Sequence, residues 1–268
     1  MSKQGKKIVL KGCAMRIVMK MTIFLTVCGV VLAAVSANAA TGENFKLLGV
    51  GAVISTSPYR GVGQTVQPVP MVVYDVKNFY IRGVEAGYHF YSSDSVTLSV
   101  VTAPRFMGYD SGDSDALSGM DKRKMSWDAG LRADVDLPIG EDVKVSVKFV
   151  NDVLSRYDGR EANVALSKRF KSGYFQLTPS IGARLQSSQM VDYYYGVTSA
   201  EAATDRPAYD PGHAVNYFAD VMFNFGINKN WIVMTRVGVE FPDSGIRKSP
   251  IVGQDVLVTG LVGVARRF

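Results

Sequence analysis

The feature that most constrains this chain is a strict two-residue alternation of apolar and polar side chains between residues 126 and 154. The first segment has apolar residues at Trp127, Ala129, Leu131, Ala133, Val135 and Leu137. After a break at 138–142, the pattern resumes with Val143, Val145, Val147 and Phe149. Successive side chains of a β-strand point to opposite faces, whereas helical periodicity would mix the two sets. The stretch therefore predicts a hairpin whose strands each match the roughly 9–11 residues that cross a bilayer when tilted.

Alternation alone does not separate a membrane-spanning sheet from a soluble sheet with one buried face. Recurrence of the pattern favours the membrane. Strands of similar length are predicted at 46–56, 67–74, 79–90, 96–106, 126–137, 143–154, 161–170, 174–186, 214–227, 231–241 and 255–268. Aromatic residues stand near strand ends, where interfacial girdles lie, at Trp127, Phe175, Trp231 and Phe241. Beyond the first forty residues no apolar run is long enough for a spanning helix, so an integral membrane protein has to be a barrel.

The connections differ sharply in length. Short turns are predicted at 138–142, 171–173 and 228–230, and long polar loops at 107–125, 187–212 and 242–253. Short periplasmic turns and longer external loops are the rule for outer-membrane barrels. We therefore predict an all-β fold, a transmembrane antiparallel up-and-down β-barrel in the cell outer membrane.

The number of strands is less certain from the sequence than the fold class. Eleven predicted segments conflict with the even strand number of bacterial single-chain barrels. A break between Gly83 and Gly87 would divide segment 79–90 and give about twelve strands, which is our preferred count. Irregular pairing of two segments leaves ten strands open.

The first 39 residues are typical of a cleavable secretory signal peptide, which leaves residues 40–268 as the outer-membrane barrel. A basic leader without acidic residues precedes an apolar run at 21–35. The motif Ala37-Asn38-Ala39 then supplies the small-x-small cleavage pattern. Translation from the first residue, from Met15 or from Met19 remains open.

Removal of the leader changes the charge and the cysteine content. The leader holds six of the 30 Lys and Arg residues, so that 24 remain against 24 Asp and Glu. A mature chain near neutrality gives no electrostatic reason to expect a nucleic-acid partner. Both cysteines, Cys13 and Cys28, also lie in the leader, so the mature chain has no disulfide or thiol chemistry.

Few residues suggest catalysis or metal binding. The mature chain has two histidines, His89 and His213, and Ser187 and Ser188 lie near a predicted loop mouth. Their spacing does not assemble a nucleophile–base pair, and we interpret both histidines as rim or lumen residues. An acidic loop follows, at Asp110, Asp113, Asp115 and Asp121, but it lacks the ordered ligand pattern of an EF-hand. We expect a solvated surface loop there, and no catalytic, cofactor or metal residue is assigned.

The polar face of the predicted strands carries both signs of charge. The set comprises Asp128, Arg132, Asp134, Asp136, Lys144, Lys148, Arg169, Arg184, Asp220, Arg236 and Glu240. Such side chains either pair with one another and fill a small interior or line water, because barrels of ten or twelve strands lie between filled and open sizes. We predict Leu131, Val145 and Val221 to face lipid. Arg132, Lys144 and Asp220 are predicted to face the lumen.

Several loop motifs resemble the MltA-interacting protein/OmpV family. They are Tyr194-Tyr195-Gly196-Val197-Thr198-Ser199-Ala200-Glu201-Ala202-Ala203, Pro207-Ala208-Tyr209-Asp210, Asp113-Ser114-Asp115-Ala116-Leu117, Ser249-Pro250-Ile251-Val252 and Pro68-Val69-Pro70-Met71. The resemblance covers residues 45–268, with a departure where Asp210 and Pro211 precede Gly212. It implies an outer-membrane barrel and, for one branch, a scaffold linking a lytic transglycosylase to a murein synthase of the penicillin-binding type. It implies no catalytic residues.

Three classes of function follow. A scaffold or interaction barrel is favoured through the resemblance, with outer-membrane lipid around it and murein enzymes as partners. A small pore or solute-uptake barrel is the alternative, based on the mixed-charge interior. A lipid-modifying barrel enzyme comes third and rests only on the two histidines. A scaffold contact has to use the turns 138–142 and 171–173 and residues 40–45, because the long loops face outward.

Overall fold

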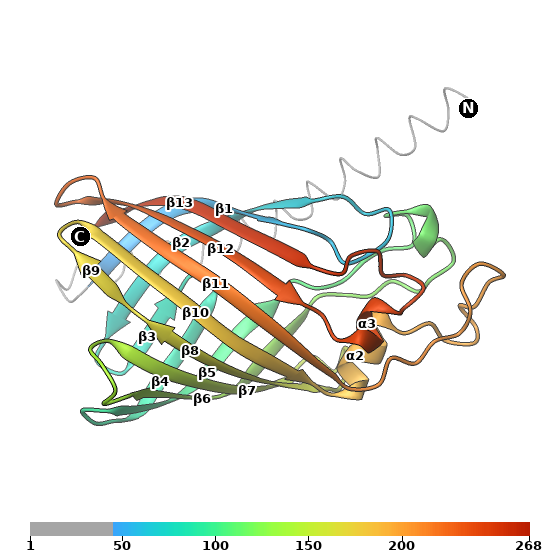
Figure 1. Ribbon diagram of the computed structural model, residues 1–268, viewed down its shortest axis with the longest axis horizontal. Helices are drawn as coiled ribbons and strands as arrows, with labels where there is room; N and C mark the ends of the chain where they lie inside the picture. The colour runs from blue at the N-terminus through green and yellow to red at the C-terminus, as the bar shows by residue number, and fades with distance from the viewer. Residues whose placement is uncertain (1–44) are drawn as a thin grey trace.

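A closed antiparallel sheet forms the wall of the molecule, and the computed structural model describes residues 45–268 (Figure 1). The strands are β1 (Phe45–Ser55), β2 (Thr65–Val76), β3 (Phe79–Arg82), β4 (Glu85–Ser92), β5 (Val96–Arg105), β6 (Ser126–Asp136), β7 (Val143–Asp152), β8 (Arg160–Lys168), β9 (Phe170–Ser172), β10 (Phe175–Gln186), β11 (Ala214–Gly226), β12 (Trp231–Phe241) and β13 (Leu257–Arg267). Neighbours in the sheet follow one another along the chain, and β13 pairs with β1 to close the ring. The predicted up-and-down barrel is therefore confirmed.

Thirteen strand segments form twelve wall strands, because β8 and β9 share one neighbour. β8 pairs with residues 180–186 of β10, and β9 pairs with residues 175–177. Pro179 of β10 lies opposite the interruption. The Tyr174 carbonyl accepts a hydrogen bond from the Gly226 amide of β11, so the backbone of Pro179 is directed to the other side, toward the break. A proline there costs the ladder no hydrogen bond, as expected for proline at a strand irregularity.

The predicted break in segment 79–90 is confirmed. Gly83 begins a tight turn between β3 and β4, with φ of +64°, a conformation that glycine adopts without steric cost. The two short strands pair with each other through four residues on each side. The count is therefore twelve, and the ten-strand alternative is excluded.

The short β3 leaves one side of β2 without a neighbouring strand over part of its length. β3 pairs only with Val73–Val76, and within the described chain no strand pairs with residues 65–72 on this side. The Gly83 amide donates to the Val72 carbonyl, so even-numbered β2 residues direct their backbone toward this edge. Pro68 and Pro70 therefore stand where their missing amides would face the free edge. Prolines at such positions protect an edge against further strand pairing.

The two faces of the wall follow the predicted alternation. Leu131 is 56 % exposed on the outer face, and Val221 and the partly exposed Val145 share that face. Arg132 contacts Glu85 across the interior, and Asp220 pairs with Arg236. The predicted assignment of lipid-facing and lumen-facing residues is confirmed.

The two ends of the barrel differ (Figure 1). The long connections gather at one end with the helices η1 (Asp115–Leu117), α2 (Ser188–Tyr195) and α3 (Ser244–Arg247), and the short turns and the C-terminus lie at the other. We refer to these as the outer and the periplasmic end, following the loop-length rule. No helix within residues 45–268 has the length and apolarity needed to span a bilayer. The signal peptide predicted at 1–39 lies outside the described residues.

Candidate functional site

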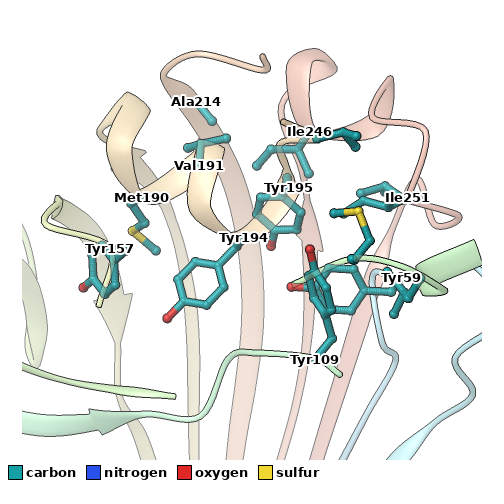
Figure 2. Packing of buried hydrophobic residues seen from close by; sticks show 14 residues of the cluster. Tyr59, Tyr109, Tyr157, Met190, Val191, Tyr194, Tyr195, Ala214, Ile246 and Ile251 are labelled. Atoms are coloured by element: carbon teal, nitrogen blue, oxygen red, sulfur yellow. The ribbon is translucent and has the colours of Figure 1, made fainter. Parts of the chain in front are cut away.

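The loops at the outer mouth of the barrel build a hydrophobic core among themselves (Figure 2). We call this structure the outer plug; it comprises the packed parts of loops 56–64, 106–125, 153–159, 187–213 and 242–256. Its buried members are Tyr59, Tyr109, Leu117, Met120, Tyr157, Met190, Val191, Tyr194, Tyr195, Val197, Ala214, Ile246, Ile251 and Val252. All five long connections contribute. The loops predicted to be long and polar therefore also bury apolar side chains at this end.

Helix α2 forms the centre of the outer plug. Its buried residues are Met190, Val191, Tyr194 and Tyr195, which recur with the spacing of one helical face. Ser187 precedes it with extended backbone angles, and the Gly196 amide closes it on the Asp192 carbonyl. The sequence contains this spacing, but the sequence analysis predicts a loop at 187–212. The apolar face of α2 stabilises the helix only by packing against residues from the other loops.

Aromatic rings fill the space beside α2. The rings of Tyr59 and Tyr109 meet edge to face, with centroids 4.6 Å apart, and Tyr195 lies 6.1 Å from Tyr59. Figure 2 shows these side chains converging from separate segments on one interior. Edge-to-face contacts of this kind contribute beyond the area that they bury. They join the first, second and fourth long loops into one unit.

A buried ion pair joins two of the loops. Arg123 and Glu201 lie 2.8 Å apart, with side chains only 9 % and 3 % exposed. Glu201 also accepts hydrogen bonds from the amides of Asp121 and Thr198. Burial opposes the charged form of Glu201, but these amides and the Arg123 guanidinium hold its pKa below the usual value. Arg206 adds a hydrogen bond of 2.9 Å to the Ala116 carbonyl.

Four of the five motifs that carry the family resemblance meet in the outer plug. Leu117 ends the first of them and is fully buried, and Tyr194, Tyr195 and Val197 belong to the longest. The Ser249 hydroxyl donates to the Tyr195 carbonyl at 2.6 Å, which ties two motifs together. The fifth motif, residues 68–71, lies on β2 in the wall. Motifs that lie far apart in the sequence thus come together in the outer plug.

Two carboxyl groups face each other in the outer plug. Asp192 of α2 interacts with Asp210, and its Oδ1 accepts a hydrogen bond from the Gly212 amide at 3.1 Å. Burial and the neighbouring Asp210 carboxyl raise the pKa of Asp192 to about 6. The pair therefore changes its charge in the range in which ordinary carboxyl groups are already ionised.

Below the outer plug, a continuous chain of polar contacts runs along the inner side of the wall from β5 to β12. We call it the polar belt; it consists of Arg105, Asp128, Glu161, Gln186, Asn216, Glu240 and Arg184. Arg105 lies between Asp128 at 2.6 Å and Glu161 at 3.2 Å. Gln186 donates to Glu161 at 3.0 Å, and Asn216 links Gln186 to Glu240. Arg184 completes the belt by pairing with Glu240.

A second charged group lies nearer the periplasmic end. Glu85 accepts from Arg132 at 2.5 Å and from Lys148 at 3.3 Å. Beside it, the fully buried Tyr80 packs against Val101 and Val150 and fills part of the lumen. The sequence left open whether the charged interior cross-pairs or lines water. In the structure every member of the predicted set except Arg169 makes an ion pair.

Three interior residues were missed by sequence reasoning. Glu85 was missed because it stands at the start of β4, directly after the predicted break in segment 79–90. Arg105 and Glu161 stand at strand ends, where the alternation is hardest to follow. All three fit the two-residue periodicity once the strand bounds are known.

The candidate catalytic residues do not form one site. His89 lies on β4 in the interior, with its Nδ1 2.7 Å from the Ser99 hydroxyl and its ring stacked on Tyr80. His213 lines a groove of about 430 Å³ near the outer end, together with Ser187 and Ser188. Within the described chain no hydrogen bond joins His213 to either serine, and the Ser187 hydroxyl instead accepts from the Arg160 amide. The arrangement brings these residues together without assembling an activated nucleophile.

The acidic loop has no metal-binding geometry. Among residues 45–268, no group of three or more His, Cys, Asp or Glu side chains is placed to hold a metal ion. Asp113 accepts a hydrogen bond from the Asp110 amide at 2.7 Å, and Lys122 pairs with Asp110 at 3.1 Å. These contacts shape the loop, and Leu117 at its centre is buried in the outer plug.

The twelve-stranded wall, its exposed apolar outer face and its paired interior define an outer-membrane β-barrel. The sequence model of the family described as MltA-interacting protein MipA matches residues 48–268, and the chain belongs to this family. The MltA-interacting protein of Escherichia coli K12 is 28 % identical over 244 residues, which cover 89 % of this chain and 96 % of that protein. The outer membrane protein OmpV of Vibrio cholerae is 32 % identical over 167 residues, or 62 % and 64 % of the two chains.

The comparison with solved structures finds a porin and a transporter. The NanC porin covers 82 % of this chain and 100 % of its own, with a TM-score of 0.47 and 9 % identity. The toluene transporter TbuX of Ralstonia pickettii has a TM-score of 0.44, also with 9 % identity, over 85 % and 90 % of the two chains. Together with the family membership, the fold makes this chain an outer-membrane protein.

Proposed function

We propose that this protein is a non-catalytic outer-membrane scaffold that holds murein-cleaving and murein-synthesising enzymes at the inner face of the membrane. The observation that carries the proposal is the packed outer mouth together with the paired interior. The outer plug packs the loops at the outer end, and nearly all charges of the predicted interior set pair with one another. The name of the Escherichia coli relative, MltA-interacting protein, supports a murein enzyme as partner.

The contact surface for such partners is small. Of the described chain, short turns, among them 138–142 and 171–173, and the C-terminal residues lie at the periplasmic end. Stable protein interfaces bury roughly 1,200–2,000 Å² in total, more than a few turn residues offer one partner. We therefore infer a weak contact that partners assemble jointly, with the proposed mature N-terminus at 40–45 contributing outside the described residues. The partner enzymes are inferred to be a lytic transglycosylase and a murein synthase of the penicillin-binding type.

A turn-graft experiment tests this proposal. Replacing 138–142 and 171–173 by neutral Gly/Asn turns should abolish co-purification of murein enzymes. Heat-dependent gel mobility should be unchanged, because the grafts touch only two residue pairs of the short β9 and leave the other strand pairings intact. The matched control is the same graft at another short periplasmic turn, residues 93–95, which should leave co-purification intact. Binding that survives the double graft and disappears when 187–212 is shortened would contradict the proposed orientation.

Solute uptake is the second candidate, favoured by the Asp192–Asp210 pair. Ionisation of the partly buried Asp192 beside Asp210 would loosen the outer plug. A barrel that opens in this way conducts at pH 8 and is closed at pH 5. Conductance in planar bilayers at the two pH values separates this candidate from a permanently closed scaffold.

A further inference from the structure

The periplasmic rim carries a cluster of basic residues that the wall does not use. Three segments, 168–174, 226–231 and 265–268, contain no Asp or Glu. Their basic residues are Lys168, Arg169, Lys171, Lys229, Arg266 and Arg267, which we call the basic arc. All except Arg169 are exposed. Such a single-sign cluster has to be explained, because surface charges of one sign repel each other.

Hydrogen bonds place the three segments side by side. The Gly226 amide donates to the Tyr174 carbonyl at 2.9 Å, which joins the first segment to the second. The Arg267 amide donates to the Asn230 carbonyl at 2.6 Å, which joins the second to the third. The basic arc is therefore one continuous surface that covers the ends of β9 to β13.

The remaining part of the rim is acidic. The periplasmic turns and strand ends between β2 and β7 carry Asp75, Asp94, Asp136, Glu141 and Asp142, against Lys77 and Lys144. Lys144 pairs with Asp136 at 3.5 Å within this part, and Lys171 pairs with Asp142 at 3.5 Å across the boundary. Within the described chain the other members of the basic arc have no ion pair. The rim is thus divided by charge, and the three described basic segments contain no acidic side chain.

We propose that the basic arc binds murein itself, through the carboxylates of its stem peptides. This inference rests on the proposed scaffold function, because enzymes held at this rim work on murein. Single exposed ion pairs are weak, so a ligand has to present many carboxylates at short intervals. A polymer with repeating acidic peptides does so, and several weak contacts on one polymer reinforce one another.

The positions of the side chains favour a ligand below the membrane over lipid around it. Lys171 and Arg267 stand on lumen-facing positions of their strands, next to the outward-facing Phe170 and Phe268, and Lys229 lies in a turn. Lys168 and Arg266 occupy lipid-facing positions instead, where each stacks on a neighbouring aromatic ring. Headgroups at the outer wall can therefore neutralise only part of the basic arc.

Sedimentation with protein-free murein sacculi tests the proposal on the full-length barrel in a neutral detergent. The triple variant Lys171→Ser, Lys229→Ser and Arg267→Ser should bind about tenfold more weakly, as expected for the loss of three exposed charge contacts. The control variant Lys122→Ser, Lys124→Ser and Lys248→Ser removes the same charge at the outer end and should bind like the wild type. If the triple variant does not fold, the double variant Lys171→Ser and Lys229→Ser leaves the closing strand intact and should show part of the loss.

Two further arms identify the ligand. The wild-type protein should no longer sediment with sacculi whose carboxyl groups have been amidated. Vesicles of anionic phospholipid should bind the wild type and the triple variant equally. Equal sedimentation of the triple and control variants, or retention on amidated sacculi, would overturn the proposal. Loss of vesicle binding without loss of sacculus binding would overturn it in favour of lipid. The sedimentation assay contains no enzyme, so a negative result there does not contradict the scaffold proposal. Equally, a failure of murein enzymes to co-purify does not contradict the proposal that the basic arc binds murein.

Discussion

At the scale of single residues, the stability of the outer plug depends most on Glu201. Its carboxylate satisfies Arg123 and two amides in a region closed to water. Replacement by alanine leaves the guanidinium buried without a counter-charge, which typically costs about 3–5 kcal/mol. We expect Glu201→Ala to increase amide hydrogen exchange throughout 188–213 while heat-dependent gel mobility stays normal. Glu141→Ala, an exposed change at the other end, is the control. Equal exchange in the two variants would show that the Arg123–Glu201 ion pair is dispensable.

The stability of the outer plug should also depend on pH through Asp192. The pKa of Asp192 is about 6 in the folded protein, above the 3.8 of the free side chain. The folded state therefore holds this proton more tightly, so its contribution to stability is complete below about pH 4 and is lost as the pH rises through 6. Hydrogen exchange in 188–213, corrected for intrinsic rates, should be faster at pH 8 than at pH 5. Asp192→Asn should remove the difference, Asp158→Asn should not, and unchanged pH dependence in the first variant would disprove this role.

At the scale of elements, the two faces of each strand make opposite demands. Leu131 faces lipid, where an arginine near the midplane costs roughly 2–4 kcal/mol. Leu131→Arg should therefore impair assembly, measured by heat-dependent gel mobility. Thr97 of the neighbouring strand faces the lumen opposite Asp134, so Thr97→Arg adds the same side chain beside an acid and should assemble. Equal assembly of the two variants would contradict the assignment of faces.

The sequence also predicts that Arg132→Leu is better tolerated than Leu131→Arg. The structure makes Arg132 a poor neutral comparison, because it pairs with Glu85 and Asp134. Its removal leaves two acidic side chains in the lumen short of a partner, which has a cost of its own. Thr97 is the cleaner control, since it has no such partners to lose.

Strands could be predicted from the sequence because each depends on its own two-residue pattern. Gly83 even located the division that raises the strand count to twelve. The outer plug could not be predicted, because its contacts join residues far apart along the chain. Arg123 and Glu201 are 78 positions apart, and neither belongs to a local periodicity. The sequence predicts a loop where the short α2 forms, because the apolar face of this helix is stabilised only by packing against the residues of other loops, such as Tyr59 and Ile246.

At the scale of the whole molecule, a packed outer end directs function to the periplasmic end. The wall separates the interior from lipid, the outer plug packs the loops at the mouth, and the polar belt runs along the wall beneath it. What remains accessible to partners is the rim of short turns, with its division into basic and acidic parts. The scaffold proposal and the murein-binding proposal both follow from this division of the surface.

Conductance in planar bilayers tests the closed barrel most directly. We expect the wild-type protein to give no stepwise current at pH 5 or at pH 8. A variant in which a short Gly/Ser linker replaces 187–212 loses α2 and Glu201 together, and it should give stepwise current, which also proves insertion under the same conditions. A steady stepwise current from the wild type would contradict the account: current at both pH values would mean an open pore, and current confined to pH 8 would mean an outer plug that opens for solute uptake.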